Sequence, residues 1–229
     1  MIDACTLLIG KSFTGKTARM VWELNTEPRV VLVDPKCAQL VKLKGYAHLW
    51  PVFDFESSKV LGRPVWTNST GAEVAKFFRK RLDSAFRVVI HCRNAHREQL
   101  ELICNLLLAV KNLALAVDEC ALLMPTGPPN ALPRNVTAVV VSGTHEHIKF
   151  IGTSQRTLFH NMVRANASKI LWYRITLKDD LAVASNYLPE EFVSQLSSLP
   201  DYVCIEWNDC GIPFRDETLV GKIKVLKAR

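Results

Sequence analysis

Short apolar runs alternate along the chain with longer stretches in which apolar residues recur every three or four positions. The runs are rich in Val, Ile and Leu, which predicts strands that are buried on both faces. They lie at 6–9, 29–34, 87–92, 113–117, 149–154 and 169–174, with further strands expected at 202–207 and about 220–226. Helical spacing is found at 18–24, 72–82, 97–111, 157–166 and 190–196. Strands that alternate with helices predict an α/β fold with a mostly parallel central sheet flanked by helices.

Two neighbouring stretches do not follow this alternation. Residues 125–135 are rich in Pro and Gly, which predicts a mobile loop. Residues 136–142 are mostly β-branched, and their propensity alone predicts a strand. No internal repeat and no second-domain boundary is visible. We therefore expect a single domain over 1–229, with a core over about 1–190 and C-terminal strands with a basic tail over about 200–229.

Composition and charge add limits on the class of protein. The 229 residues are 48% hydrophobic and 22% charged, as expected for one globular domain. The apolar runs are too short to span a bilayer, and we expect no signal peptide. Seven cysteines include no Cys-x-x-Cys pair, which favours thiols in a reducing compartment. The formal net charge of +7 fits a polyanionic partner.

The first chemical motif follows the first apolar run. Residues 10–17 match the phosphate-loop pattern GxxxxGK[ST], or Walker A, at every required position, between a predicted strand and a predicted helix. Its glycines let the backbone approach phosphate oxygens, and the helix N-terminus adds a positive dipole end. The residues expected to bind nucleotide are Gly10, Lys11, Ser12, Phe13, Thr14, Gly15, Lys16, Thr17 and Ala18. The sequence therefore predicts a site for ATP and Mg²⁺, with Lys16 on the β- and γ-phosphates and Thr17 on the metal ion.

The second motif ends the apolar run 113–117. Asp118 and Glu119 follow it directly, as in a Walker B strand. We expect Asp118 to hold Mg²⁺ through water and Glu119 to polarise the attacking water as a catalytic residue. A full strand–helix unit over 88–111 separates the two motifs, which favours a RecA-like, additional-strand (ASCE) P-loop NTPase.

Other constellations are weaker. His145 and His147 form a His-x-His pair, and His91 and His96 lie near each other in sequence, but neither pair brings the further ligands that a zinc site needs. No Gly-x-Ser-x-Gly elbow is present.

Beyond the Walker motifs, several segments resemble the HerA–FtsK superfamily of DNA-pumping ATPases. Gly143-Thr144-His145 stands where that family has a GRH-like element, and Lys149–Arg156 resembles its strand that ends in a polar Gln. Arg164-Ala165-Asn166, a strand ending at Arg174, and Val33-Asp34-Pro35-Lys36 also match. The resemblance covers roughly residues 1–190 and is strongest to the genome-packaging ATPases of tailless, membrane-containing double-stranded DNA viruses.

The resemblance implies roles that the residues alone do not supply. Gln155 would be a catalytic sensor of the γ-phosphate or the attacking water. The subunits would form a homo-oligomeric ring, typically a hexamer, with double-stranded DNA through its pore, docked on a capsid or membrane vertex protein. Such a motor would work in the cytoplasm of the host cell or in association with the virion. The resemblance also implies that 136–142 is helical, against its propensity.

One departure from the family pattern concerns the arginine finger. The arginine of the GRH-like element is Thr144 here, and a threonine cannot supply charge. If the role is retained, Arg134, Arg156 and Arg164 are the nearest candidates, with Arg156 and Arg164 favoured.

Three other functions compete with a packaging motor. A conjugation or filamentous-phage assembly ATPase of the same superfamily usually carries a membrane segment or an extra N-terminal domain, and the sequence predicts neither. A nucleotide-gated assembly switch with slow hydrolysis does not need the carboxylate of Glu119. Small-molecule kinases rarely combine Asp-Glu with a downstream strand that ends in Gln.

Overall fold

The chain forms strands and helices in alternation. The computed structural model describes residues 5–37, 39–61, 65–92, 97–124, 126–127, 131–208 and 222–227. Its strands are β1 (Cys5–Ile9), β2 (Arg29–Asp34), β3 (Ala47–Leu49), β4 (Phe86–His91), β5 (Leu113–Val117), β6 (Ile148–Ser154), β7 (Lys169–Trp172), β8 (Val203–Asn208) and β9 (Lys222–Lys227). Its helices are α1 (Lys16–Glu23), α2 (Phe55–Leu61), α3 (Asn68–Arg79), α4 (Arg97–Val110), α5 (Arg134–Ser142), α6 (Asn161–Ala165), α7 (Lys178–Ala184) and α8 (Glu190–Val193).

The described strands form one sheet of nine, in the order β3-β4-β2-β5-β6-β1-β7-β8-β9. Every pairing from β3 to β7 is parallel, whereas β8 and β9 are added antiparallel at one edge. Because β2, β5, β6 and β1 are neighbours and parallel, their carboxyl ends meet at the same edge of the sheet. Polar residues at the ends of these strands, among them Asp34, Asp118 and Gln155, therefore lie at this edge.

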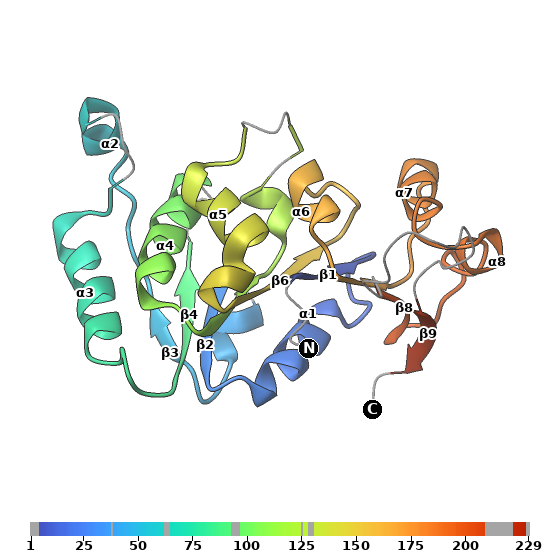
Figure 1. Cartoon of the computed structure of the whole chain (residues 1–229), viewed down its shortest axis with the longest axis horizontal. Helices are drawn as coiled ribbons and strands as arrows, with labels where there is room; N and C mark the ends of the chain where they lie inside the picture. The colour runs from blue at the N-terminus through green and yellow to red at the C-terminus, as the bar shows by residue number, and fades with distance from the viewer. Residues whose placement is uncertain are drawn as a thin grey trace.

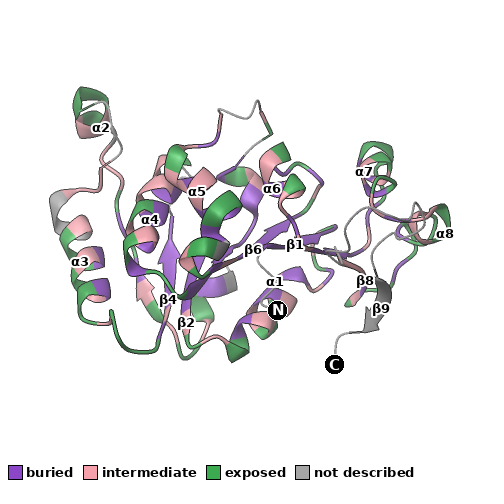
Figure 2. Ribbon diagram, in the orientation of Figure 1, coloured by how far each residue is buried: buried purple, intermediate pink, exposed green. Residues whose placement is uncertain are grey.

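Helices cover both faces of the sheet (Figure 1). Along β2, Val31 and Val33 belong to one core cluster, while Val30 and Leu32 belong to the other. The first cluster includes the buried stripes of α4 and α5, and the second packs against α1. The central strands are buried except at Arg29 of β2 and Lys149 of β6, which are half-buried (Figure 2). This explains why they read as unbroken apolar runs rather than as alternating ones.

The β-branched segment 136–142 is helical, so the strand expected from its propensity is wrong and the helix implied by the resemblance is right. Val136, Val139 and Val140 lie on one buried stripe at helical spacing. The first turn is fixed by Glu101 of α4, whose carboxylate accepts hydrogen bonds from the backbone N–H groups of Asn135 and Val136 at 3.0–3.1 Å. A carboxylate at a helix N-terminus satisfies orphan donors and complements the dipole, and packing overrides a propensity of a few tenths of a kcal/mol per residue.

Other boundaries also differ from expectation. Arg134 is the first residue of α5 and does not lie in a loop reaching 135. The helix expected over 157–166 is confined to Asn161–Ala165. β3, α2 and α7 were not predicted, because each is short and lacks a distinctive apolar pattern.

Within the described residues, no helix is both long and apolar enough to cross a bilayer. The described cysteines form no disulfide.

We predict that Glu101→Ala destabilises the fold through α5. Removing the carboxylate strands the first N–H groups of the helix, which should lower the free energy of unfolding by about 1–2 kcal/mol. Urea denaturation measures this value. Glu98→Ala is the matched control, because the Glu98 carboxylate on the same helix pairs, within the described residues, with Arg97 at the surface. Equal losses for the two variants would contradict the assignment.

Candidate functional site

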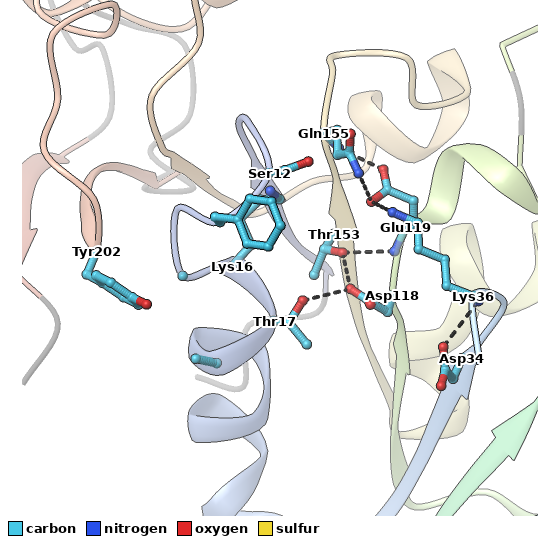
Figure 3. A pocket seen from close by; sticks show the side chains of 13 residues that line it. Ser12, Lys16, Thr17, Asp34, Lys36, Asp118, Glu119, Thr153, Gln155 and Tyr202 are labelled. Carbon is cyan, nitrogen blue, oxygen red and sulfur yellow. Dashed lines mark hydrogen bonds and ion pairs between the residues drawn. The ribbon is translucent and has the colours of Figure 1, made fainter. Parts of the chain in front are cut away.

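A cavity of about 380 Å³ opens at the carboxyl edge of the central strands. It is lined by Ser12, Phe13, Gly15, Lys16, Thr17, Ala18, Asp34, Lys36, Asp118, Glu119, Thr153, Gln155 and Tyr202. Most of these residues come from the loop after β1, the start of α1, and the ends of β2, β5 and β6, and Tyr202 directly precedes β8 (Figure 3).

The loop between β1 and α1 bends tightly against the ends of neighbouring strands. The Gly10 N–H donates to Ser154 O at 3.1 Å, and the Lys11 N–H donates to Arg174 O at 2.8 Å. A Cβ atom at Gly10 would lie 2.5 Å from Tyr173 Cβ, so no larger residue fits. Gly15 has φ +96°, a left-handed conformation that glycine adopts without strain. The two glycines of the motif are thus required by close approach and by backbone geometry respectively.

Lys16 lies in the first turn of α1 and is buried. Its Nζ donates to Lys11 O at 2.7 Å, so the ammonium folds back into the loop. Burial lowers the pKa of Lys16 to about 8, against the opposing effect of the Glu119 and Asp118 carboxylates. A phosphate group in the cavity would favour the charged form, because an opposite charge within a few ångströms stabilises the ammonium.

The side-chain oxygens of Thr17 and Asp118 lie next to each other in the cavity. Thr17 Oγ1 donates to Asp118 Oδ1 at 3.1 Å, and Thr153 Oγ1 from β6 donates to the same oxygen at 2.7 Å. Burial raises the pKa of Asp118, and the two hydroxyl groups oppose that shift. Hydroxyl and carboxylate oxygens beside a phosphate loop are the ligands that Mg²⁺ prefers. These residues fit a magnesium ion, which would supply charge for the phosphates.

Glu119 adopts a left-handed backbone conformation, with φ 51° and ψ 57°, where β5 ends. Its backbone N–H donates to Thr153 Oγ1 at 2.9 Å. Both carboxylate oxygens are occupied: Oε1 accepts from the Gln155 N–H at 2.9 Å, and Oε2 accepts from Gln155 Nε2 at 3.2 Å and from Lys36 Nζ at 2.8 Å. The carboxylate, the amide and the ammonium therefore form one cluster, and Lys36 reaches it from the turn after β2 (Figure 3).

The turn that carries Lys36 is fixed by Asp34. Asp34 Oδ1 accepts from the backbone N–H groups of Lys36 and Cys37 at 3.2 and 2.9 Å. Asp34 Oδ2 lies 3.1 Å from His91 Nδ1, and His91 Nε2 lies 2.9 Å from His48 Nδ1. Burial lowers the pKa of His91, while the Asp34 carboxylate opposes the change. His48, His91 and Asp34 thus form a chain of side-chain contacts that ends at this turn.

The structure gathers most of the predicted site residues in the cavity, but not all of them. Those that line it are Ser12, Phe13, Gly15, Lys16, Thr17, Ala18, Asp118, Glu119 and Gln155. Gly10, Lys11 and Thr14 shape the loop instead, with Thr14 Oγ1 donating to Lys11 O at 2.8 Å.

None of the three candidate arginines lines the cavity. Arg156 is engaged by Asp180, with Nε 3.1 Å from Oδ2. Arg164 donates through Nη2 to Asn161 Oδ1, and its buried Nε has no hydrogen-bond partner within the described residues. Arg134 is exposed at the start of α5. The described residues also contain no group of three or more His, Cys, Asp or Glu side chains arranged for a metal ion, and His96 lies outside them.

Sequence reasoning missed four cavity residues: Asp34, Lys36, Thr153 and Tyr202. For three of them, the position in the sequence could have predicted a place in the cavity. Asp34 and Lys36 directly follow a buried strand, and Thr153 precedes Gln155 on another, so the parallel-sheet edge already pointed to them. Tyr202 had no such signal, because it joins the cavity through the long return from β7 to β8.

Several solved structures have a fold similar to that of this chain. The B204 genome-packaging NTPase of Sulfolobus turreted icosahedral virus 2, in complex with ATP-γ-S, superposes with a TM-score of 0.67 at 14% identity, over 98% of this chain and 97% of that one. The two chains therefore share a fold. B204 from Sulfolobus turreted icosahedral virus, a DNA-packaging ATPase, gives 0.63 at 16% identity, over 99% and 98% of the two chains. VirB4 of Thermoanaerobacter pseudethanolicus gives 0.59 at 13% identity, over 98% and 89%.

No protein-family model and no curated protein sequence matches the chain. The predicted P-loop α/β fold is confirmed.

We predict that Glu119→Gln retains nucleotide binding and loses turnover. Gln has nearly the same shape but cannot accept a proton from water, so kcat should fall by about 10²–10⁴. Phosphate release measures kcat, and calorimetry measures nucleotide affinity. Glu98→Gln, a surface carboxylate of α4, is the matched control and should keep both values. A Glu119→Gln protein with normal kcat would show that Glu119 is structural.

Proposed function

We propose that this protein is an ATP-hydrolysing motor that translocates double-stranded DNA and packages a viral genome into a capsid. The observation that carries the proposal is the position of Glu119. Its carboxylate lies in the same cavity as the Thr17–Asp118 pair and contacts Gln155 from the next strand. Hydrolysis of a nucleoside triphosphate requires a phosphate-binding loop, side chains that bind the metal ion, and a group that accepts the proton of the attacking water.

Each side chain has a distinct task in this mechanism. Lys16 supplies positive charge to the terminal phosphates, and the loop N–H groups orient them. Thr17 and Asp118 would hold Mg²⁺, which neutralises phosphate charge when bound. Glu119 orients the attacking water and accepts its proton. Gln155 is positioned beside Glu119 to contact either the water or the γ-phosphate.

The contacts of Glu119 also bear on how fast the protein works without a partner. Both carboxylate oxygens accept hydrogen bonds, from Gln155 and Lys36, so a water molecule at the carboxylate would compete with these donors. We expect this competition to keep basal hydrolysis slow. This observation favours a motor stimulated by its track, and it also keeps the slow nucleotide-gated switch as a second candidate.

Several features support double-stranded DNA as the track. The fold matches two packaging enzymes over almost their whole length. The net charge of +7 favours a polyanion. We propose a homo-oligomeric ring, typically a hexamer, docked on a capsid or membrane vertex protein, in the cytoplasm of the host cell or in association with the virion. VirB4 has a related fold, so a conjugation or assembly ATPase is the alternative within the same mechanism.

We predict that double-stranded DNA raises the ATPase rate and binds without sequence preference. Translocation must engage any sequence, so contacts should go to phosphates and release counterions. Even two phosphate contacts would weaken binding roughly tenfold between 50 and 200 mM salt, and more contacts would weaken it further. The ATPase rate with and without DNA tests the motor, and a binding titration at several salt concentrations tests the contacts. Hydrolysis that ignores DNA would favour the switch.

We predict that Arg164 acts across a subunit boundary. Arg164→Ala should lower turnover by about 10³ or more, as loss of an arginine finger does. Mixing this protein with Lys16→Ala, which has a dead site but an intact Arg164, should restore activity at the shared interface. Arg134→Ala and Arg156→Lys are tested in the same way. Lysine is used at 156 because alanine would remove the cation that pairs with the buried Asp180 carboxylate. If no arginine variant loses turnover, the finger hypothesis is wrong.

A further inference from the structure

The nucleotide cavity has two chemically different ends. Lys36, Asp118, Glu119 and Gln155 form one end, beyond the start of α1 (Figure 3). Tyr202 lies on the opposite side of α1, well separated from these polar groups. The polar end suits terminal phosphates and their metal ion. The aromatic end has no task in the hydrolysis described above.

Tyr202 is held firmly against the phosphate loop. Its backbone N–H donates to Thr14 O at 3.1 Å. The ring packs on Gly15 so closely that a Cβ atom there would lie 2.5 Å from Tyr202 Cδ1. Tyr202 has φ +63°, which is rare for a bulky aromatic residue and persists only where surrounding contacts impose it.

A separate set of contacts fixes the turn that precedes Tyr202. Arg174, just after β7, donates through Nη2 to Asp201 Oδ1 at 2.6 Å and through Nη1 to Leu199 O at 3.3 Å. Arg174 O in turn accepts from the Lys11 N–H of the phosphate loop. The loop and the aromatic ring are therefore braced by the same residue, and their relative position is set before any ligand binds.

Despite this bracing, Tyr202 remains 55% exposed. One side of the ring contacts the loop, and the rest is open at the cavity. A fixed, exposed aromatic ring is a stacking platform, since every nucleobase presents a flat π-face. The nucleoside must leave the phosphate loop away from the end that holds Glu119, which directs it to the side of Tyr202.

Among the residues that the structure describes, the side chains near Tyr202 offer few hydrogen-bonding groups for the edge of a base. On the loop side, the cavity-lining side chains are those of Ser12, Phe13 and Ala18, while all lining carboxylates and the one lining amide lie at the polar end. Base discrimination usually requires paired donors and acceptors on the base edge, and stacking alone does not supply them.

We propose that Tyr202 stacks on the nucleobase of the bound nucleoside triphosphate, and that this site accepts different bases with similar affinity. The proposal rests on the nucleotide site proposed above and extends it to the nucleoside. In this proposal the protein recognises its ligand through the triphosphate. The nucleobase adds binding energy by stacking on Tyr202 but does not determine which nucleotide binds.

Equilibrium binding of three ligands, each with Mg²⁺, tests the proposal: ATP, GTP and inorganic tripolyphosphate. The wild-type protein should bind ATP and GTP within about tenfold of each other. Tyr202→Ala should weaken both nucleotides by roughly 5- to 150-fold, the range of one stacking contact, and leave tripolyphosphate unchanged. Tyr202→Phe should bind like wild type. Tyr202→Leu keeps apolar packing on Gly15 without a π-face and should behave like Tyr202→Ala.

Controls separate this proposal from the assignment of the phosphate site. Trp22→Ala removes another exposed aromatic side chain from α1, outside the cavity, and should leave all three affinities unchanged. Lys16→Ala should weaken all three ligands, and normal tripolyphosphate binding by that variant would overturn the phosphate site itself. Tyr202→Leu that binds ATP like wild type, or a preference for ATP over GTP above about 100-fold, would overturn the stacking platform alone.

Discussion

The buried carboxylate of Asp118 is the constraint on which the site depends. It is 9% exposed, so its charge needs partners that the fold must supply. Two hydroxyl groups supply them, Thr17 from α1 and Thr153 from β6. The partners come from segments far apart in sequence, and satisfying one carboxylate therefore fixes the phosphate loop relative to the Walker B strand. A metal ion would replace these hydrogen bonds at a position that is already built.

The same strand end determines the behaviour of Glu119. Directly after Asp118, Glu119 takes a left-handed conformation that is uncommon for a non-glycine residue. Its carboxylate is then surrounded by donors from two other strand ends, Lys36 and Gln155. Both donors are groups that a phosphate also attracts. A γ-phosphate in the cavity would therefore compete with the Glu119 carboxylate for Lys36 and Gln155, and nucleotide binding would free that carboxylate to act as the general base.

The sequence predicted the residues whose role is local and missed those whose role depends on the return of the chain. The phosphate loop and Asp118-Glu119 are contiguous motifs, so their chemistry can be read without a structure. Lys36 contacts Glu119 across 83 positions, and Tyr202 reaches Thr14 from the opposite end of the chain. The helix at 136–142 illustrates the same limit for the fold. Its β-branched residues favour a strand, and only Glu101 at its first turn and the buried stripe against the core reverse that preference.

Among the residues that the structure describes, the cavity has more acidic than basic side chains. Among the lining residues that the structure describes, two lysines, Lys16 and Lys36, face three carboxylates, Asp34, Asp118 and Glu119. Lys36 is already paired with Glu119 at 2.8 Å, and Lys16 is left as the cation for the phosphates. A magnesium–triphosphate complex brings further negative charge, and a transition state that spreads it over the transferred group needs more positive charge nearby. Arg134, Arg156 and Arg164 all lie outside the lining. A cation carried by a neighbouring copy of the chain would correct this deficit, and it would make hydrolysis conditional on assembly.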